Sequence, residues 1–119
     1  MKFVGKREAP MTLARQRKLL GNHLNFAASE AYKLLRTNLM FALPDNKECR
    51  VIGITSALQG EGKSTTSVNL AYTIAQTGER VLMIEADMRL PNVAQRLALR
   101  PTLGLSDLLA GLCTREEAI

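Results

Sequence analysis

The sequence predicts an α/β fold with a parallel sheet, and three consecutive stretches support this prediction. An apolar segment begins at Val51 and leads into a turn with glycines at positions 60 and 62. Helical periodicity follows from Lys63, and a second, uninterrupted apolar run occupies residues 81–84. Strand, helix and strand in this order form a βαβ unit, in which a right-handed crossover joins two parallel strands.

The first 26 residues show no sustained periodicity, and we expect residues 1–26 to form a basic, poorly ordered tail. Through Lys18 this stretch holds six basic residues and one acidic residue, a balance that equals the net charge of +5 of the 119-residue chain. A basic leader can contact an anionic membrane surface or nucleic acid, or it can stay solvated, and we favour the solvated tail. Residues 27–119 are then the folded part, a partial domain.

Composition and motif spacing argue against several classes of protein. No apolar run approaches the roughly 18 residues that span a bilayer, and the N-terminus lacks the apolar core of a signal peptide. Cys49, Cys113 and His23 share no metal-ligand spacing, so neither a metal centre nor a disulfide is expected. We therefore expect a cytoplasmic protein that reaches a membrane only through a partner.

A first helix is predicted over residues 29–42, with Ser29 as its N-cap. Its apolar positions fall on one stripe, namely Ala31, Leu34, Leu35, Leu39 and Ala42. At 100° per residue, Glu30, Lys33 and Arg36 lie about 180° from that stripe. These charges form either a solvated face with i,i+3 ion pairs or a patch that docks a neighbouring subunit, and the pattern alone favours the solvated face.

The loop before the second helix has the layout of a phosphate-binding P-loop, GxxxxGK[ST], with Ala57 in place of the first glycine. Gly60 and Gly62 let backbone N–H groups point inward as a nest for a polyphosphate, and the helix adds its free N-terminal donors. Lys63 can reach the β and γ oxygens, and the Ser64 hydroxyl can complete the shell of Mg²⁺. We therefore predict binding of ATP and Mg²⁺ at Gly60, Glu61, Gly62, Lys63, Ser64 and Thr65.

Two acids, Glu85 and Asp87, directly follow the second apolar run. Parallel strands end at the same edge of a sheet, so these carboxylates are expected beside the phosphate loop, where they can hold Mg²⁺ or accept a proton. Alternatively they are turn residues, with Asp87 bonded to local backbone; we favour the functional interpretation. Short helices are predicted over 91–99 and 105–110, and no third apolar strand ending in Asp follows, so the sheet is truncated after its second strand.

These motifs together resemble the N-terminal half of the bacterial tyrosine kinases, the P-loop autokinases of capsule and exopolysaccharide synthesis. The resemblance is carried by EAYKLLRTN at 30–38, QGEGKSTTSVNLA at 59–71 and VLMIEADMRLP at 81–91, and GLSDLLAG at 104–111 is similar to the segment that follows in the family. It implies a P-loop NTPase-like three-layer fold with a parallel sheet. It also implies an ATP-dependent protein tyrosine autokinase that regulates capsular or exopolysaccharide biosynthesis.

The resemblance further implies roles for single residues. Lys63 and Asp87 would be catalytic, and Ser64, Asp87 and Glu85 would bind the metal, with Thr65 in the nucleotide site. Glu85 replaces the usual first Asp of the family's second acidic motif, and its added methylene displaces the carboxylate, which puts direct coordination by Glu85 in doubt.

The family's ExxRxxR motif, which is implicated in ring assembly, corresponds to Glu30, Lys33 and Arg36, so the resemblance favours assembly for this face. Lys33 keeps the charge of the arginine but loses its bidentate fork, which weakens such a contact. The expected partners are copies of the chain in a ring and a membrane-embedded polysaccharide co-polymerase or activator protein, with no nucleic acid.

Two parts of the family are missing from the sequence: the Walker B strand and the C-terminal tyrosine cluster. Tyr32 and Tyr72 lie within predicted helices and are interpreted as packing residues. In the family the Walker B strand lies between the two strands predicted here, so each would have an unpaired edge. We therefore interpret the sequence as a fragment.

Two alternatives remain. One is a partitioning or cell-division ATPase of the deviant Walker type, which carries a signature lysine where this chain has Leu58. The other is a catalytically inactive nucleotide-binding fragment, because the metal site lacks a ligand without Walker B.

Overall fold

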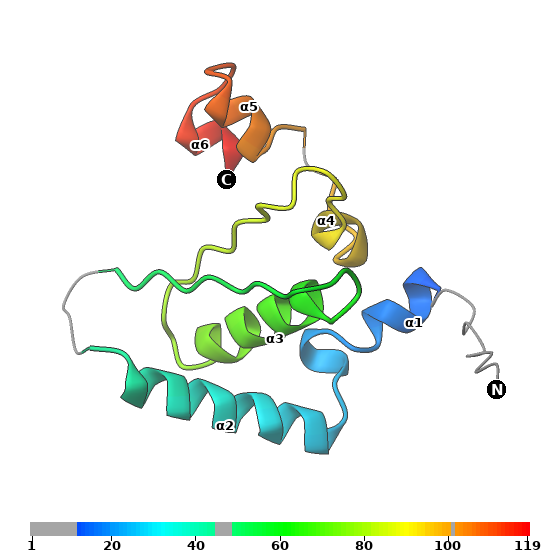
Figure 1. Cartoon of the computed structure of the whole chain (residues 1–119), viewed down its shortest axis with the longest axis vertical. Helices are drawn as coiled ribbons and strands as arrows, with labels where there is room; N and C mark the ends of the chain where they lie inside the picture. The colour runs from blue at the N-terminus through cyan, green and yellow to red at the C-terminus, as the bar shows by residue number, and fades with distance from the viewer. Residues whose placement is uncertain (1–11, 45–48, 101) are drawn as a thin grey trace, which may run out of the picture.

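The computed structural model describes residues 12–44, 49–100 and 102–119, and the described part is helical. Figure 1 shows its elements in chain order. They are α1 (Leu13–Arg17), the 3₁₀ helix η1 (Gly21–His23), α2 (Phe26–Ala42), α3 (Lys63–Ala75), α4 (Val93–Arg96), α5 (Leu105–Leu109) and α6 (Arg115–Ala118).

The long helix α2 begins earlier than predicted. Asn25 is its N-cap, and the Asn25 side chain accepts a hydrogen bond from the backbone N–H of Ala28 at 2.8 Å. Ser29, the predicted cap, instead lies inside the first turn, where its backbone N–H donates to the carbonyl of Asn25. An asparagine before a helix is as good a cap as a serine, so the sequence offered two candidates and the structure uses the first.

The side of α2 that contacts α3 is not the predicted apolar stripe. The two helices lie side by side (Figure 1), yet Leu34 is 62% exposed and Leu35 is 42% exposed. Arg36, predicted to lie on the opposite, solvated side, instead turns toward α3 and donates from Nη1 to the carbonyl of Thr73 at 2.6 Å. Helix α3 is the main neighbour of α2, so it covers one side of α2. That side is the one that carries Arg36.

Residues 12–26, which we expected to belong to the poorly ordered tail, instead contain α1, which contacts α4, and η1, which contacts α3. Residues 1–11 lie outside the described residues. Leu20 is only 4% exposed and forms the core with Val68 and Val93. The fully buried side chain of Asn69 accepts from the N–H of Gly21 and donates to the carbonyl of Leu19, both at 2.8 Å. One amide thus satisfies two backbone groups and fixes this segment to α3.

The predicted parallel sheet is not confirmed, because no strand is assigned in the described ranges. The two predicted strands are extended segments without a ladder, and most of their large apolar side chains are exposed: Val51 is 89% exposed and Leu82 57% exposed, whereas Met83 is partly buried against the core. An extended segment has no internal hydrogen bonds, so its backbone N–H and C=O groups need a neighbouring strand as hydrogen-bond partner. The chain is correspondingly open, with a radius of gyration of 16.6 Å, against about 13.5 Å for a compact domain of this length.

Helices α4 and α5 lie within the two short helices predicted over 91–99 and 105–110, and α6 was not predicted. α5 and α6 pack on each other at one end of the long axis of the molecule (Figure 1). Asp107 accepts from the N–H of Gly104 at 2.9 Å, and Glu117 accepts from the N–H of Thr114 at 2.8 Å, so each helix is capped by its own carboxylate. Among the helices described, none is long and apolar enough to span a membrane.

Candidate nucleotide-binding site

The predicted phosphate loop leads directly into the N-terminus of α3, and its backbone N–H groups are available to a ligand. Gly60 and Gly62 have φ angles of +85° and +91°, a left-handed conformation that favours glycine. Among the described residues, none of the backbone N–H groups from Gly60 to Thr65 has a hydrogen-bond partner. Unpaired donors in a left-handed turn that leads into a helix form the nest that an anionic phosphate group needs.

Lys63 lies across this loop. Its Nζ donates to Ser56 Oγ at 3.1 Å, and the Ser56 hydroxyl donates to the carbonyl of Leu58 at 2.9 Å. Because the ammonium is bonded to a neutral hydroxyl, a phosphate oxygen would be a stronger acceptor for it. The arrangement therefore leaves the charge of Lys63 available for an anion.

Glu61 has a contact that the sequence analysis did not foresee. Its carboxylate accepts from the backbone N–H of Leu58 at 3.0 Å, which ties the two sides of the loop together. Acidic residues three positions from a backbone donor commonly make such a bond in turns, so the spacing of Leu58 and Glu61 was the available signal. Glu61 thus shapes the loop from within and adds a negative charge at its edge.

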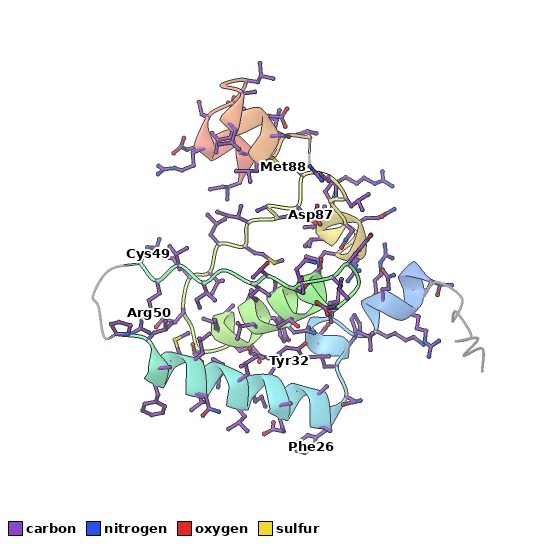
Figure 2. All side chains as sticks on the ribbon, in the orientation of Figure 1. Phe26, Tyr32, Cys49, Arg50, Asp87 and Met88 are labelled. Atoms are coloured by element: carbon purple, nitrogen blue, oxygen red, sulfur yellow. The ribbon has the colours of Figure 1, made fainter. Side chains whose placement is uncertain are left out.

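The two predicted acids are bonded to the backbone that follows them. Glu85 accepts from the N–H groups of Asn92 at 2.7 Å and of Val93 at 3.1 Å, so it caps the start of α4. Asp87 accepts from the N–H of Leu90 at 3.1 Å, as the turn interpretation expected, and Figure 2 shows it beside α4. Within the described residues, no hydrogen bond or ion pair joins Lys63 to either acid.

Helix α4 connects the acidic segment to the phosphate loop. Arg96 Nη1 donates to Thr65 Oγ1 at 3.2 Å, while Glu85 holds the other end of α4. The sequence analysis did not select Arg96, because an arginine in a short helix carries no pattern of its own. Glu85 and Thr65, which lies in the first turn of α3, are therefore linked through α4, and the predicted sheet edge is not formed in the described residues.

These residues fit a phosphate group better than they fit a metal ion alone. The open N–H groups and Lys63 suit a polyphosphate, whereas no group of three or more His, Cys, Asp or Glu side chains gathers in the described part of the chain. Ser64 and Asp87 could hold Mg²⁺ only together with phosphate oxygens and water, which is the usual way that proteins bind this ion.

The predicted assembly residues separate into two groups. Lys33 and Glu30 form an exposed ion pair with an N–O distance of 2.8 Å, while Arg36 caps the C-terminal part of α3. Figure 2 shows Phe26 at the start of the same helix pointing away from the rest of the chain. The exposed surface of α2 thus carries the ion pair and apolar side chains, without the guanidinium of Arg36.

Comparison with known proteins identifies the family. The AAA domain family matches residues 49–116, more than half of the chain. A tyrosine-protein kinase of Bacillus subtilis (strain 168), YwqD, is 45% identical over 91 residues, which cover 76% of this chain and 38% of YwqD. A tyrosine-protein kinase of Streptococcus agalactiae, CpsD, is 40% identical over 83 residues, which cover 69% of this chain and 35% of CpsD.

The chain thus spans well under half the length of these two relatives. No solved structure matches it. The match over residues 49–116 contains the phosphate loop, both acids and α4, so the site described above lies within the family region. The chain therefore belongs to the AAA domain family, and it is similar to bacterial tyrosine-protein kinases.

Proposed function

We propose that this chain is the nucleotide-binding part of an ATP-dependent protein tyrosine kinase that acts in capsular or exopolysaccharide biosynthesis. The observation that carries the proposal is the open nest of N–H groups from Gly60 to Thr65, with Lys63 lying across it. The names of the relatives support the tyrosine kinase, and the family supports nucleotide binding. The polysaccharide pathway rests on the sequence resemblance.

In this proposal the chain positions ATP and neutralises its charge. The loop amides and the Lys63 ammonium hold the β- and γ-phosphates and stabilise the negative charge that spreads over the transferred group. Mg²⁺, bound through the Ser64 hydroxyl, Asp87 and phosphate oxygens, would neutralise the same oxygens. The second oxygen of Asp87 can orient the attacking tyrosine hydroxyl or take its proton.

Two features of this structure must change before the γ-phosphate can be transferred: the contact of Lys63 and the unpaired extended segments. Lys63 has to exchange Ser56 for a phosphate oxygen, and the two extended segments need a neighbouring strand, which in the parallel sheet we propose lies between them. Glu85, engaged at the start of α4, supports the metal site through the position of α4 rather than by direct coordination.

The proposed partners are those expected from the resemblance. The exposed pair of Glu30 and Lys33 on α2 is available to a second copy of the chain in a ring. A membrane-embedded polysaccharide co-polymerase or activator would bring the otherwise cytoplasmic protein to the membrane, and no nucleic acid partner is proposed.

Titration of a fluorescent ATP analogue against the chain tests the nucleotide site. We expect Lys63→Ala to weaken binding at least tenfold, because it removes the cation that faces the β- and γ-phosphates. Lys18→Ala is the matched control, since it removes the same charge from an exposed position after α1, and it should leave the curve unchanged. Superimposable curves for the parent and Lys63→Ala would exclude the proposed site.

Transfer of the γ-phosphate to tyrosine by the longest reading frame that contains the chain tests the reaction. Phosphotyrosine that disappears in Lys63→Ala supports the kinase. ATP hydrolysis without phosphotyrosine would instead favour an ATPase of the partitioning or cell-division type, against which Leu58 already argues. Nucleotide binding with neither activity would leave an inactive nucleotide-binding fragment.

A further inference from the structure

A cavity lies away from the phosphate loop, between α1, η1, α3 and the end of α4. Its volume is ≈ 390 Å³, and none of residues 60–65 lines it. This volume lies within the range of small-molecule sites, which are about 300–1,000 Å³ and often occur between helices. The cavity is therefore large enough for one small ligand, and it is separate from the site proposed for ATP.

One part of the cavity wall is apolar. Leu20 and Val68, two members of the hydrophobic core, line it together with Leu97 and the ring of Tyr72. Aliphatic and aromatic groups at one wall favour a flat apolar group, because its transfer from water into such a site is favourable by about 25 cal/mol per Å² of buried apolar area.

The other part of the wall is positively charged. Arg17 and Arg96 both line the cavity, and no described lining residue is acidic. Their hydrogen bonds go to neutral groups: Arg17 Nη2 donates to the carbonyl of Gln95 at 3.4 Å, and Arg96 Nη1 donates to Thr65 Oγ1 at 3.2 Å. Arg96 Nε is buried and has no hydrogen-bond partner among the described residues. Two guanidinium groups thus border an apolar cavity without a carboxylate between them.

We propose that this cavity binds a small organic anion, that is, a carboxylate, sulfonate or phosphate monoester attached to a flat apolar body. The anionic group would pair with the Nη donors of Arg96 and Arg17, whose forked geometry matches such oxygens. The apolar body would lie against Leu20, Val68 and Tyr72. The proposal does not rest on the kinase function, because none of residues 60–65 lines the cavity; Arg96 itself is also bonded to Thr65 at the start of α3.

A nuclear magnetic resonance titration with 2-naphthalenesulfonate tests the site, and 2-naphthalenemethanol serves as the neutral probe of the same shape. We expect saturable shifts at the amides of Gly21, Asn22 and Ala98, with the signals of Gly60 and Gly62 unmoved. The neutral probe should bind at least tenfold more weakly. Equal binding of the two probes, a titration without saturation, or shifts centred on the phosphate loop would each overturn the proposal.

Three substitutions at the two arginines examine the cationic wall with the same probe. Arg96→Gln and Arg17→Gln should each weaken binding of the sulfonate at least fivefold, and Arg96→Lys should restore part of it. Arg115→Gln is the control, since Arg115 is paired with Glu116 on the distant helix α6, and it should change nothing. Because Arg17 is exposed, its variant keeps the fold intact even if Arg96→Gln does not, and unchanged affinity in Arg17→Gln would contradict the assignment.

Discussion

The helical unit of α2, α3 and η1 differs from the two extended segments, residues 51–56 and 81–86, in how its backbone is hydrogen-bonded and in which side chains it buries. The helical unit buries Leu20 and Asn69 and pairs its own backbone. The extended segments leave Val51 and Leu82 exposed and form no ladder with each other. A helix completes its hydrogen bonds within one segment, whereas a strand depends on a neighbour, so the extended segments contribute little to the core beyond Met83.

Replacement of one leucine in each region gives the largest predicted contrast. Leu20→Ala should lower the free energy of unfolding by about 2–4 kcal/mol, because it leaves a cavity in the core. Leu82→Ala should change it by less than about 0.5 kcal/mol, because that side chain is already in water. Urea unfolding followed by circular dichroism measures both. Equal losses in the two variants would show that Leu82 is buried in solution and that the two regions do not differ.

The buried amide of Asn69 gives the next largest effect. Asn69→Ala leaves the N–H of Gly21 and the carbonyl of Leu19 without partners, and we expect a loss of about 2 kcal/mol in the free energy of unfolding. Asn38→Ala, on the exposed side of α2, is the control and should be neutral or slightly stabilising, since alanine favours helices. Proteolysis should cut the segment before α2 faster in Asn69→Ala alone; unchanged cleavage would argue against this anchoring role.

A smaller effect is expected at the contact between α2 and α3. Arg36→Ala removes the donor to the Thr73 carbonyl and should cost about 1 kcal/mol in the free energy of unfolding. Lys33→Ala breaks an exposed ion pair on the same helix and should cost no more than about 0.5 kcal/mol. Thermal unfolding of the two variants ranks them, and a larger loss in Lys33→Ala would reverse the assignment of the packed side of α2.

The smallest effect is local and depends on pH. The N–H and hydroxyl groups of Thr114 donate to Glu117 and lower the pKa of that carboxyl below its usual range. A lowered pKa means that the capping contribution is present above the ordinary glutamate pKa and is lost as the pH falls through the lowered value. The amide shift of Thr114 should therefore titrate in acid, and Glu117→Gln should abolish the titration. A pH-independent Thr114 signal in the parent chain would show that the cap is absent in solution.

Local patterns predicted α2, α3, α4 and α5, missed α1, η1 and α6, and predicted the packing less well. Helix propensity, caps and glycine stops located those four helices because such signals act within a few residues. The extended segments were assigned as strands from their apolar character, although their pairing depends on residues elsewhere. The burial of Leu20 could not be foreseen from local sequence. Its segment is fixed by Asn69, which lies 50 positions after Leu19, and nothing in the residues around Asn69 indicates that its side chain is buried.

The candidate site shows the same division. The positive φ angles of Gly60 and Gly62 and the open loop amides followed from the motif, because each glycine and the helix start are local features. The bonds of Glu85 to the start of α4 and of Arg96 to Thr65 depend on where α4 lies, which no spacing along the chain encodes. The packed side of α2 was predicted wrongly for the same reason, because the position of α3 relative to α2 is not encoded by spacing along α2.

The contact between Arg36 and Thr73 also bears on how a distant event could reach the phosphate loop. Helix α3 begins at the loop and is held by α2 near its other end. Its 13 residues extend over about 20 Å, beyond the roughly 8 Å over which exposed charges act at physiological salt. A helix is stiff along its axis, so a displacement of α2 that moved the Thr73 end of α3 would also move the phosphate loop at its N-terminus.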